Sequence, residues 1–326
     1  MAMTNDPALI RETDLPATFL AADRWAINYQ NHHVRWLKVH VLLGVVGASA
    51  AQLAFSLTGM MGFAGALALC VLALLVTRLL VQQRPRWERI WCRSRAAAEQ
   101  VRSLSWSYMM AVDPVADGGE QPAGLGAAKA ELETLIRRVR KEWADAAGAA
   151  SESPAAGAEV TGQMDEVRLG PYPDKVRLYL EGRVKDQIQW YQRKAIFNQK
   201  RRRVFNIVTI LCELTAACIA IALLVALAKP PASRAELATA VKYLLTFIWP
   251  CLTGAAAASG WSSFRRHAEL AVTYKRSAEQ LEAIRRDLEG LMEDTASNRQ
   301  AFVRHVRDCE ELLTRENAIW FSRRTV

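Results

Sequence analysis

The stretch Val39 to Thr77 reads VHVLLGVVGASAAQLAFSLTGMMGFAGALALCVLALLVT and contains no Asp, Glu, Lys or Arg. A helix needs roughly 20 apolar residues to cross a hydrocarbon core about 30 Å thick. An uncharged run of this length therefore predicts two membrane spans, about 39–58 and 61–81, that fold back as a hairpin. Glycines loosen the helix near the middle of the run and place the tip of the hairpin at Ser56 to Gly62.

A second pair of apolar runs follows later in the chain. Val204 to Ala228 carries one charge, Glu213, and Tyr243 to Phe264 carries none. These runs predict spans of about 204–228 and 241–263. The predicted fold class is therefore an all-α membrane protein with two transmembrane helical hairpins, four spans in total, and cytoplasmic amphipathic helices.

The chain is basic, with a net charge of +9, although 51% of its residues are hydrophobic. The basic residues crowd the ends of the apolar runs, which indicates contact with lipid head groups and not with a nucleic acid polymer. Arg35 and Lys38 precede the first hairpin, and Arg78 follows it. Because short cytoplasmic flanks carry the excess of Lys and Arg, both termini are predicted to be cytoplasmic.

The chain repeats itself weakly. Tyr29-Gln30 before the first hairpin matches Tyr191-Gln192 before the second, and AEQV at 98–101 after the first matches AEQL at 278–281 after the second. We therefore predict an N-terminal unit at 1–112, a flexible linker at 113–165 and a C-terminal unit at 166–326. The linker is rich in Gly, Ala and Ser on both sides of one short helix, whose apolar face comprises Leu132, Leu135, Ile136, Val139 and Trp143.

The C-terminal end of the chain is predicted to be a helical hairpin with its turn near Glu293 to Asn298. Apolar residues recur at spacings of three and four on both sides of this turn, as in helices that pack along a seam. The second of these stripes, which we interpret as tail packing, comprises Phe302, Val306, Cys309, Leu313 and Trp320.

Two stretches resemble a known family. Tyr179 to Ala195 reads YLEGRVKDQIQWYQRKA, and Phe302 to Trp320 reads FVRHVRDCEELLTRENAIW. With the hairpin between them they resemble the SLATT family of two-span effector domains that associate with SMODS and SLOG proteins, and the N-terminal half is similar to a more divergent SLATT unit in tandem. The resemblance implies a bacterial inner-membrane effector of a nucleotide-signalling or antiphage defence system. It also implies a nucleotide messenger or an upstream sensor protein as the trigger.

Glu213 is the sharpest candidate site residue. It lies nine residues beyond Val204, roughly 13 Å along the predicted span. A carboxylate inside a membrane is costly and usually faces a bundle interior or water. Together with Gln52 of the first hairpin it would line a pore that favours cations. The alternative is a protonated Glu213 in a helix-packing hydrogen bond.

Two other features have a functional and a structural interpretation. Pro250 removes one helical hydrogen bond in the fourth span, which predicts a kink that either gates a pore or is static. Basic residues beside the second hairpin would bind a phosphorylated ligand or anchor the chain to anionic lipid. These ligand or lipid contacts are Lys200, Arg201, Arg202, Arg203, Arg265 and Arg266.

No catalytic or metal-binding motif is evident in the sequence, so we expect neither an enzyme nor a cofactor. Four spans barely enclose a path, so a pore requires a homo-oligomer in the lipid bilayer. The leading hypothesis is an effector that oligomerises and forms a pore or disrupts the membrane. The alternatives are a non-toxic ion channel and a membrane scaffold that docks a soluble partner through its cytoplasmic helices.

Overall fold

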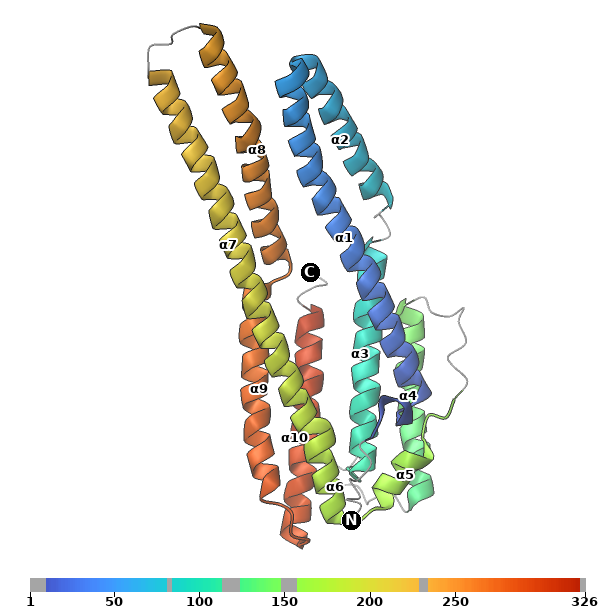
Figure 1. The fold of residues 1–326 in the computed structure, drawn as a ribbon. Helices are drawn as coiled ribbons and strands as arrows, with labels where there is room; N and C mark the ends of the chain where they lie inside the picture. The colour runs from blue at the N-terminus through green and yellow to red at the C-terminus, as the bar shows by residue number, and fades with distance from the viewer. Residues whose placement is uncertain (1–9, 81–83, 113–123, 148–156, 229–233, 323–326) are drawn as a thin grey trace, which may run out of the picture. The chain divides into compact units, whose positions relative to one another are not determined.

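A computed structural model describes residues 10–80, 84–112, 124–147, 157–228 and 234–322. Every regular element in these ranges is helical (Figure 1). After a short 3-10 turn, the helices in chain order are α1 (Ala17–Thr58), α2 (Met60–Leu80), α3 (Arg84–Met109), α4 (Leu125–Ala147), α5 (Gly162–Leu169), α6 (Tyr172–Tyr179), a π turn (Leu180–Lys185), α7 (Asp186–Ala228), α8 (Arg234–Phe264), α9 (His267–Glu289) and α10 (Ala296–Ser322).

The chain forms two compact units that cut across its sequence. The bundle unit comprises Met1–His33, Pro85–Gln192 and Arg276–Val326, and the hairpin unit comprises Val34–Arg84 and Arg193–Lys275. Each unit takes segments from both halves of the sequence. The compact units are therefore not successive stretches, and the predicted boundaries at 112 and 166 describe the order of the repeat and not the packing.

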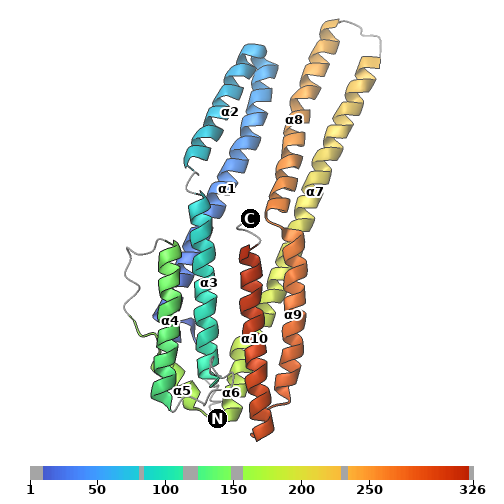
Figure 2. The same cartoon turned by 180° about the vertical axis from the view of Figure 1, so that it is seen from behind.

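The hairpin unit contains the apolar runs of the sequence. Gly59 alone separates α1 from α2 and adopts a φ of +74°, which glycine reaches without strain. This tip lies within the predicted range Ser56 to Gly62. In the second hairpin α7 and α8 run side by side in both views (Figures 1 and 2).

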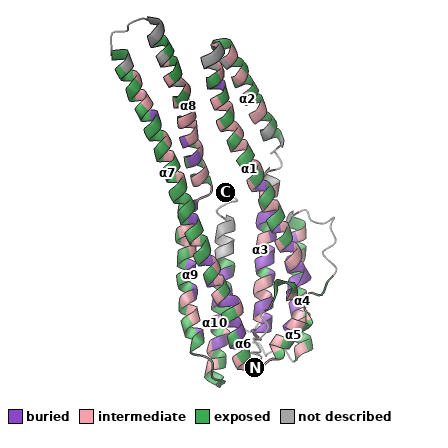
Figure 3. Cartoon of the chain, viewed as in Figure 1, coloured by how far each residue is buried: buried purple, intermediate pink, exposed green. Residues whose placement is uncertain are grey.

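Large apolar side chains are exposed along the helices of the hairpin unit (Figure 3). Such a surface is unfavourable in water but suits a hydrocarbon environment. By length and composition, three described helical stretches could cross a membrane: Ala17–Ala54, Tyr172–Val225 and Val241–Glu289. The apolar part of α2, Met60–Val76, is shorter. The exposed residues include Leu42, Val46, Leu72, Ile210, Leu214, Leu224 and Phe247.

The two helices of the first hairpin approach closely at Gly47. A Cβ atom added to Gly47 would lie 2.1 Å from Sγ of Cys70 and 2.9 Å from its Cβ, whereas one added to Gly44 would have no neighbour within 4 Å. We therefore expect Gly47→Ala to destabilise the hairpin by about 1–3 kcal/mol, because overpacking forces the backbones apart.

Thermal unfolding in detergent measures this effect, with Gly44→Ala as the matched control. Gly44 lies one helical turn earlier on the same helix and should tolerate the same methyl group. Equal stability of the two variants would contradict the close approach.

The core of the bundle unit is built from stripes on polar helices. On α4, Leu132, Ile136, Val139 and Trp143 are buried, as the spacing predicts, while Leu135 is half-buried. Trp143 donates a hydrogen bond of 2.9 Å from Nε1 to Ser94 Oγ on α3. The short helix expected inside the linker is therefore 23 residues long and packs into the bundle.

The helices α9 and α10 form the predicted hairpin. The turn occupies 290–295, slightly earlier than the predicted Glu293 to Asn298. Trp320 lies in α10, but its side chain is outside the described residues. The other four residues of the tail stripe, Phe302, Val306, Cys309 and Leu313, are buried.

Candidate functional site

Glu213 lies on the exposed surface of α7. It makes no hydrogen bond or ion pair with any residue that the structure describes. Its chain neighbour Cys212 instead faces α8, because a Cβ atom added to Gly254 would lie 3.5 Å from Cys212 Sγ. A lone carboxyl group on the outer face of an apolar helix would cost about 2.5–3.5 kcal/mol at the centre of a bilayer. No described residue is a hydrogen-bond partner of Glu213, and both interpretations of this residue stay predictions.

Gln52 differs from Glu213 in its surroundings. Its side chain is buried within the hairpin unit, with 8% of its surface exposed, whereas Glu213 is exposed. The two predicted pore-lining residues therefore do not lie on one open face of the chain. Their shared role in a pore stays a prediction.

Pro250 lies inside α8 without ending it, since the helix continues from Arg234 to Phe264. The hydroxyl group of Thr253 donates to the backbone carbonyl of Trp249 at 2.9 Å and to that of Pro250 at 3.2 Å. A nearby hydroxyl thus binds helix carbonyls beside the proline. Gating at Pro250 stays a prediction.

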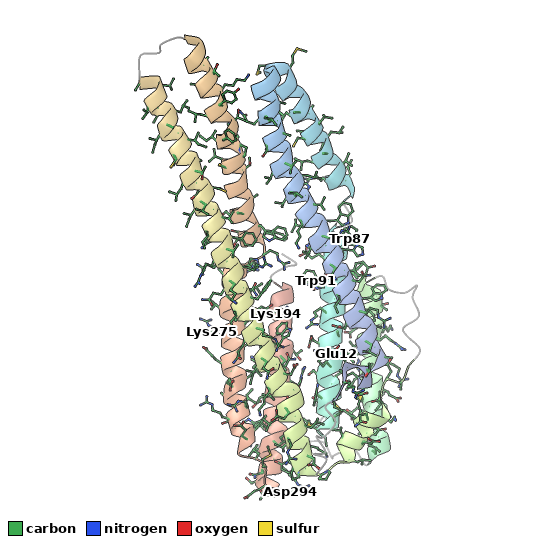
Figure 4. All side chains as sticks on the ribbon, viewed as in Figure 1. Glu12, Trp87, Trp91, Lys194, Lys275 and Asp294 are labelled. Atoms are coloured by element: carbon green, nitrogen blue, oxygen red, sulfur yellow. The ribbon has the colours of Figure 1, made fainter. Side chains whose placement is uncertain are left out.

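The predicted basic residues lie on α7 and in the turn that precedes His267. Lys200 to Arg203 are exposed on α7, and Arg265 and Arg266 form the two-residue turn between α8 and α9. Arg266 adopts a φ of +51° and pairs with Glu269 at 2.5 Å. Figure 4 marks Lys194 and Lys275, which lie at the edges of the hairpin unit on α7 and α9.

His267 joins these two helices. Its Nδ1 lies 2.7 Å from Asn198 Oδ1, and its ring stacks on Phe205 with the centroids 5.9 Å apart. Burial lowers the pKa of His267, and the charges of Arg265 and Arg201 lower it further. Arg201 and Arg265 therefore both act on one buried ring, which brings together the two basic clusters that the sequence suggested. An excess of cations at this place suits a phosphate group, whether of a lipid or of a free ligand.

A buried charged network in the bundle unit was not predicted from the sequence. Arg183, in the π turn, binds the carboxylate of Glu310 on α10 through two contacts, Nε to Oε1 at 2.9 Å and Nη2 to Oε2 at 2.7 Å. Both side chains are almost fully buried, with 2% and 4% of their surface exposed. Tyr179 donates its hydroxyl group to Glu310 Oε1 at 3.0 Å. This bidentate geometry is the strongest form of an ion pair between side chains.

The charge of Glu310 shapes the titration of its neighbours. Burial lowers the pKa of Arg183, but Glu310 outweighs that effect and raises it above its usual value. Burial raises the pKa of the Cys309 thiol to about 12, and Glu310 adds to the shift. Burial also raises the pKa of Tyr179 well above 10. The thiol and the phenol therefore stay protonated.

A second buried carboxylate, Glu99 on α3, lies in the same network. Its Oε1 is 2.6 Å from Arg95 Nη2 and 3.6 Å from Arg102 Nη1, but the first contact lacks the angles of a hydrogen bond and the second is too long for one. Burial raises the pKa of Glu99, but the charges of Arg95, Arg102 and Arg183 outweigh this effect and lower it. Glu99 is therefore an ionised acid in the field of Arg183, and its Oε1 accepts no hydrogen bond from the described residues.

The sequence contained one signal for this network. Glu310 follows Cys309 directly in the apolar stripe of the tail, and Arg183 follows Tyr179 by one turn in the other stretch that carries the family resemblance. A charged residue at a position of core spacing indicates a buried partner. Nothing in the sequence indicates which partner it is.

Comparison with protein families assigns both halves of the chain. Residues 16–175 match the family model "SMODS and SLOG-associating 2TM effector domain 3", and residues 179–320 match "SMODS and SLOG-associating 2TM effector domain 1". The chain is a tandem pair of SLATT domains. SLATT domains are associated with effector roles in bacterial signalling and defence systems. A search of the curated proteins and a search of the solved structures each gave no match.

The two SLATT domains share the charged network. Glu99 and its two arginines belong to the first domain, whereas Tyr179, Arg183 and Glu310 belong to the second. The bundle unit therefore contains buried charged residues of both domains of this multi-pass membrane protein.

Proposed function

We propose that this tandem SLATT protein is a non-enzymatic membrane effector of a bacterial defence or nucleotide-signalling system. In this proposal four helices, α1, α2, α7 and α8, span the inner membrane and both termini are cytoplasmic. The shortest of them, α2, has 21 residues and so reaches about 30 Å, which matches a hydrocarbon core. Two domains that are each described as two-span support this count.

The observation that carries the proposal is the exposed Glu213, which has no partner among the residues that the structure describes. In a single chain this carboxyl group would face lipid, at a cost of about 2.5–3.5 kcal/mol. In a homo-oligomer whose copies surround a path, the same face of α7 meets water. Oligomerisation around Glu213 thus turns an unfavourable residue into the wall of a cation path.

The experiment measures reversal potentials across planar bilayers that contain the purified protein under a KCl gradient. We expect a cation-selective current in the unaltered protein and a reversal potential close to zero in Glu213→Gln, which keeps the shape but removes the charge. Glu289→Gln removes an exposed acid of the bundle unit and should leave the selectivity unchanged. The same selectivity in Glu213→Gln and in the unaltered protein would exclude Glu213 from the path.

Induced expression in a bacterial host distinguishes an effector from a non-toxic channel. An effector should arrest growth when its trigger, a nucleotide messenger or an upstream sensor protein, is present. A channel that conducts in bilayers but leaves growth unchanged under every trigger would support the channel function instead.

A further inference from the structure

The helix that leads into the third apolar run contains one irregular segment. Between α6 and α7 the six residues Leu180–Lys185 form a π turn, in which hydrogen bonds reach one residue further than in an α-helix. A π turn therefore stores about one extra residue in an otherwise regular helix. Such turns are rare and persist only where the surroundings favour them.

The surroundings that favour this π turn are those of Arg183. Its side chain is held at both ends of the guanidinium fork by Glu310, which is itself held by Tyr179. Gly182 stands directly before it and lowers the cost of an irregular backbone. In a regular α-helix Arg183 would point in another direction and leave Glu310 unpaired in the core.

We propose that the ion pair of Arg183 and Glu310 is a latch that keeps the π turn and thereby sets the rotation of α7. When the pair opens, the segment relaxes to an α-helix without losing a residue. The part of α7 beyond the π turn then rotates by about 100° around the helix axis, the angle of one residue, and moves about 1.5 Å along this axis.

Glu99 is a second buried acid whose charge acts on Arg183. It belongs to the first SLATT domain and pairs with Arg95 at 2.6 Å. A signal that shifts α3 relative to α10 within the bundle unit would change the field at Arg183 and thereby bias the opening of the latch.

For the proposed function, the rotation regulates the exposure of Glu213, which lies on α7 beyond the turn. This consequence rests on the proposed function, because it assumes that Glu213 faces a path. The rotation of α7 itself does not rest on the proposed function. A measurement of the orientation of α7 that does not use ion flux therefore tests the rotation separately from the role of Glu213.

Cys212 is a natural reporter of this rotation. A Cβ atom at position 254 of α8 would lie 3.5 Å from Cys212 Sγ, so the thiol of Gly254→Cys should form a disulfide with it. The test uses the full chain in native membranes, with Cys218→Ala and Cys251→Ala to remove nearby thiols. The linked peptides are quantified by mass spectrometry after mild oxidation.

We expect efficient cross-linking in this background and a loss of at least fivefold when Glu310→Gln is added. Glu311→Gln is the matched control, because Glu311 is adjacent but exposed and, among the described residues, pairs with Arg315 on its own helix. Deletion of Gly182 from the Glu310→Gln variant should restore the cross-link. The segment between α6 and α7 is then one residue shorter, so as a regular α-helix it gives α7 the same orientation that the π turn gives. General unfolding would not be rescued by a deletion.

If Glu310→Gln does not accumulate in the membrane, Tyr179→Phe is the milder variant, since it removes one hydrogen bond to Glu310 and keeps the ring. It should lower the cross-linking yield about twofold. Unchanged cross-linking in both variants would overturn the latch. A loss that the removal of Gly182 does not reverse would also overturn it, and would indicate unfolding and not rotation.

Discussion

Arg183→Met is expected to lower the free energy of unfolding by about 3–5 kcal/mol. Among the described residues, the substitution leaves the buried carboxylate of Glu310 with the hydroxyl group of Tyr179 as its one side-chain partner. An uncompensated charge in the core is far more costly than a lost surface ion pair. Thermal or denaturant unfolding in detergent, followed by circular dichroism, measures the loss.

The double variant Arg183→Met with Glu310→Leu is the control. Replacing both members of a buried ion pair by apolar residues of similar size is often neutral or stabilising. We therefore expect the double variant to recover most of the lost stability, although the π turn need not survive in it. A double variant as unstable as Arg183→Met would show that shape, and not charge, holds this core together.

Trp143→Ala is expected to cost about 3–5 kcal/mol, the usual loss for a large buried aromatic. The indole ring packs edge-on against Trp25 with centroids 5.8 Å apart, and its Nε1 donates to Ser94. Limited proteolysis should then cut α4 much faster than in the unaltered protein, because Trp143 anchors this helix to α1 and α3.

Two further variants separate the parts of this effect. Trp143→Phe keeps most of the apolar surface but loses the hydrogen bond, so we expect a loss of about 1 kcal/mol. Leu135→Ala truncates a half-buried residue of the same helix and should cost less than Trp143→Ala. Equal proteolysis of Trp143→Ala and Leu135→Ala would contradict the anchoring role of Trp143.

Local patterns in the sequence predicted much of the fold. The absence of charge in Val39 to Thr77 is enough to place α2 and the apolar half of α1, and the glycines place the tip within Ser56 to Gly62, where the structure has it at Gly59. The stripes on α4 and on α10 follow from spacings of three and four. These features depend on residues that are close in the sequence, where helix geometry relates spacing to direction.

The candidate sites could be predicted only in part. Arg183 and Glu310 are 127 residues apart, and no local pattern relates them. The π turn depends on that pairing and therefore has no signal of its own. Glu213 was evident as a charge in an apolar run, but its exposure depends on how α7 packs against α8. For the same reason the sequence could not show that Gln52 is buried whereas Glu213 is exposed.

The crosswise composition of the two compact units has a consequence for the order of synthesis. The bundle unit needs residues 276–326, which a ribosome makes after all the apolar runs. Until then Arg183 has emerged without Glu310, so the nascent chain holds α1 to α8 without the acid that pairs with this guanidinium. The charged core can close only when the last helix docks, and a chain released early would present an incomplete bundle to cellular quality control.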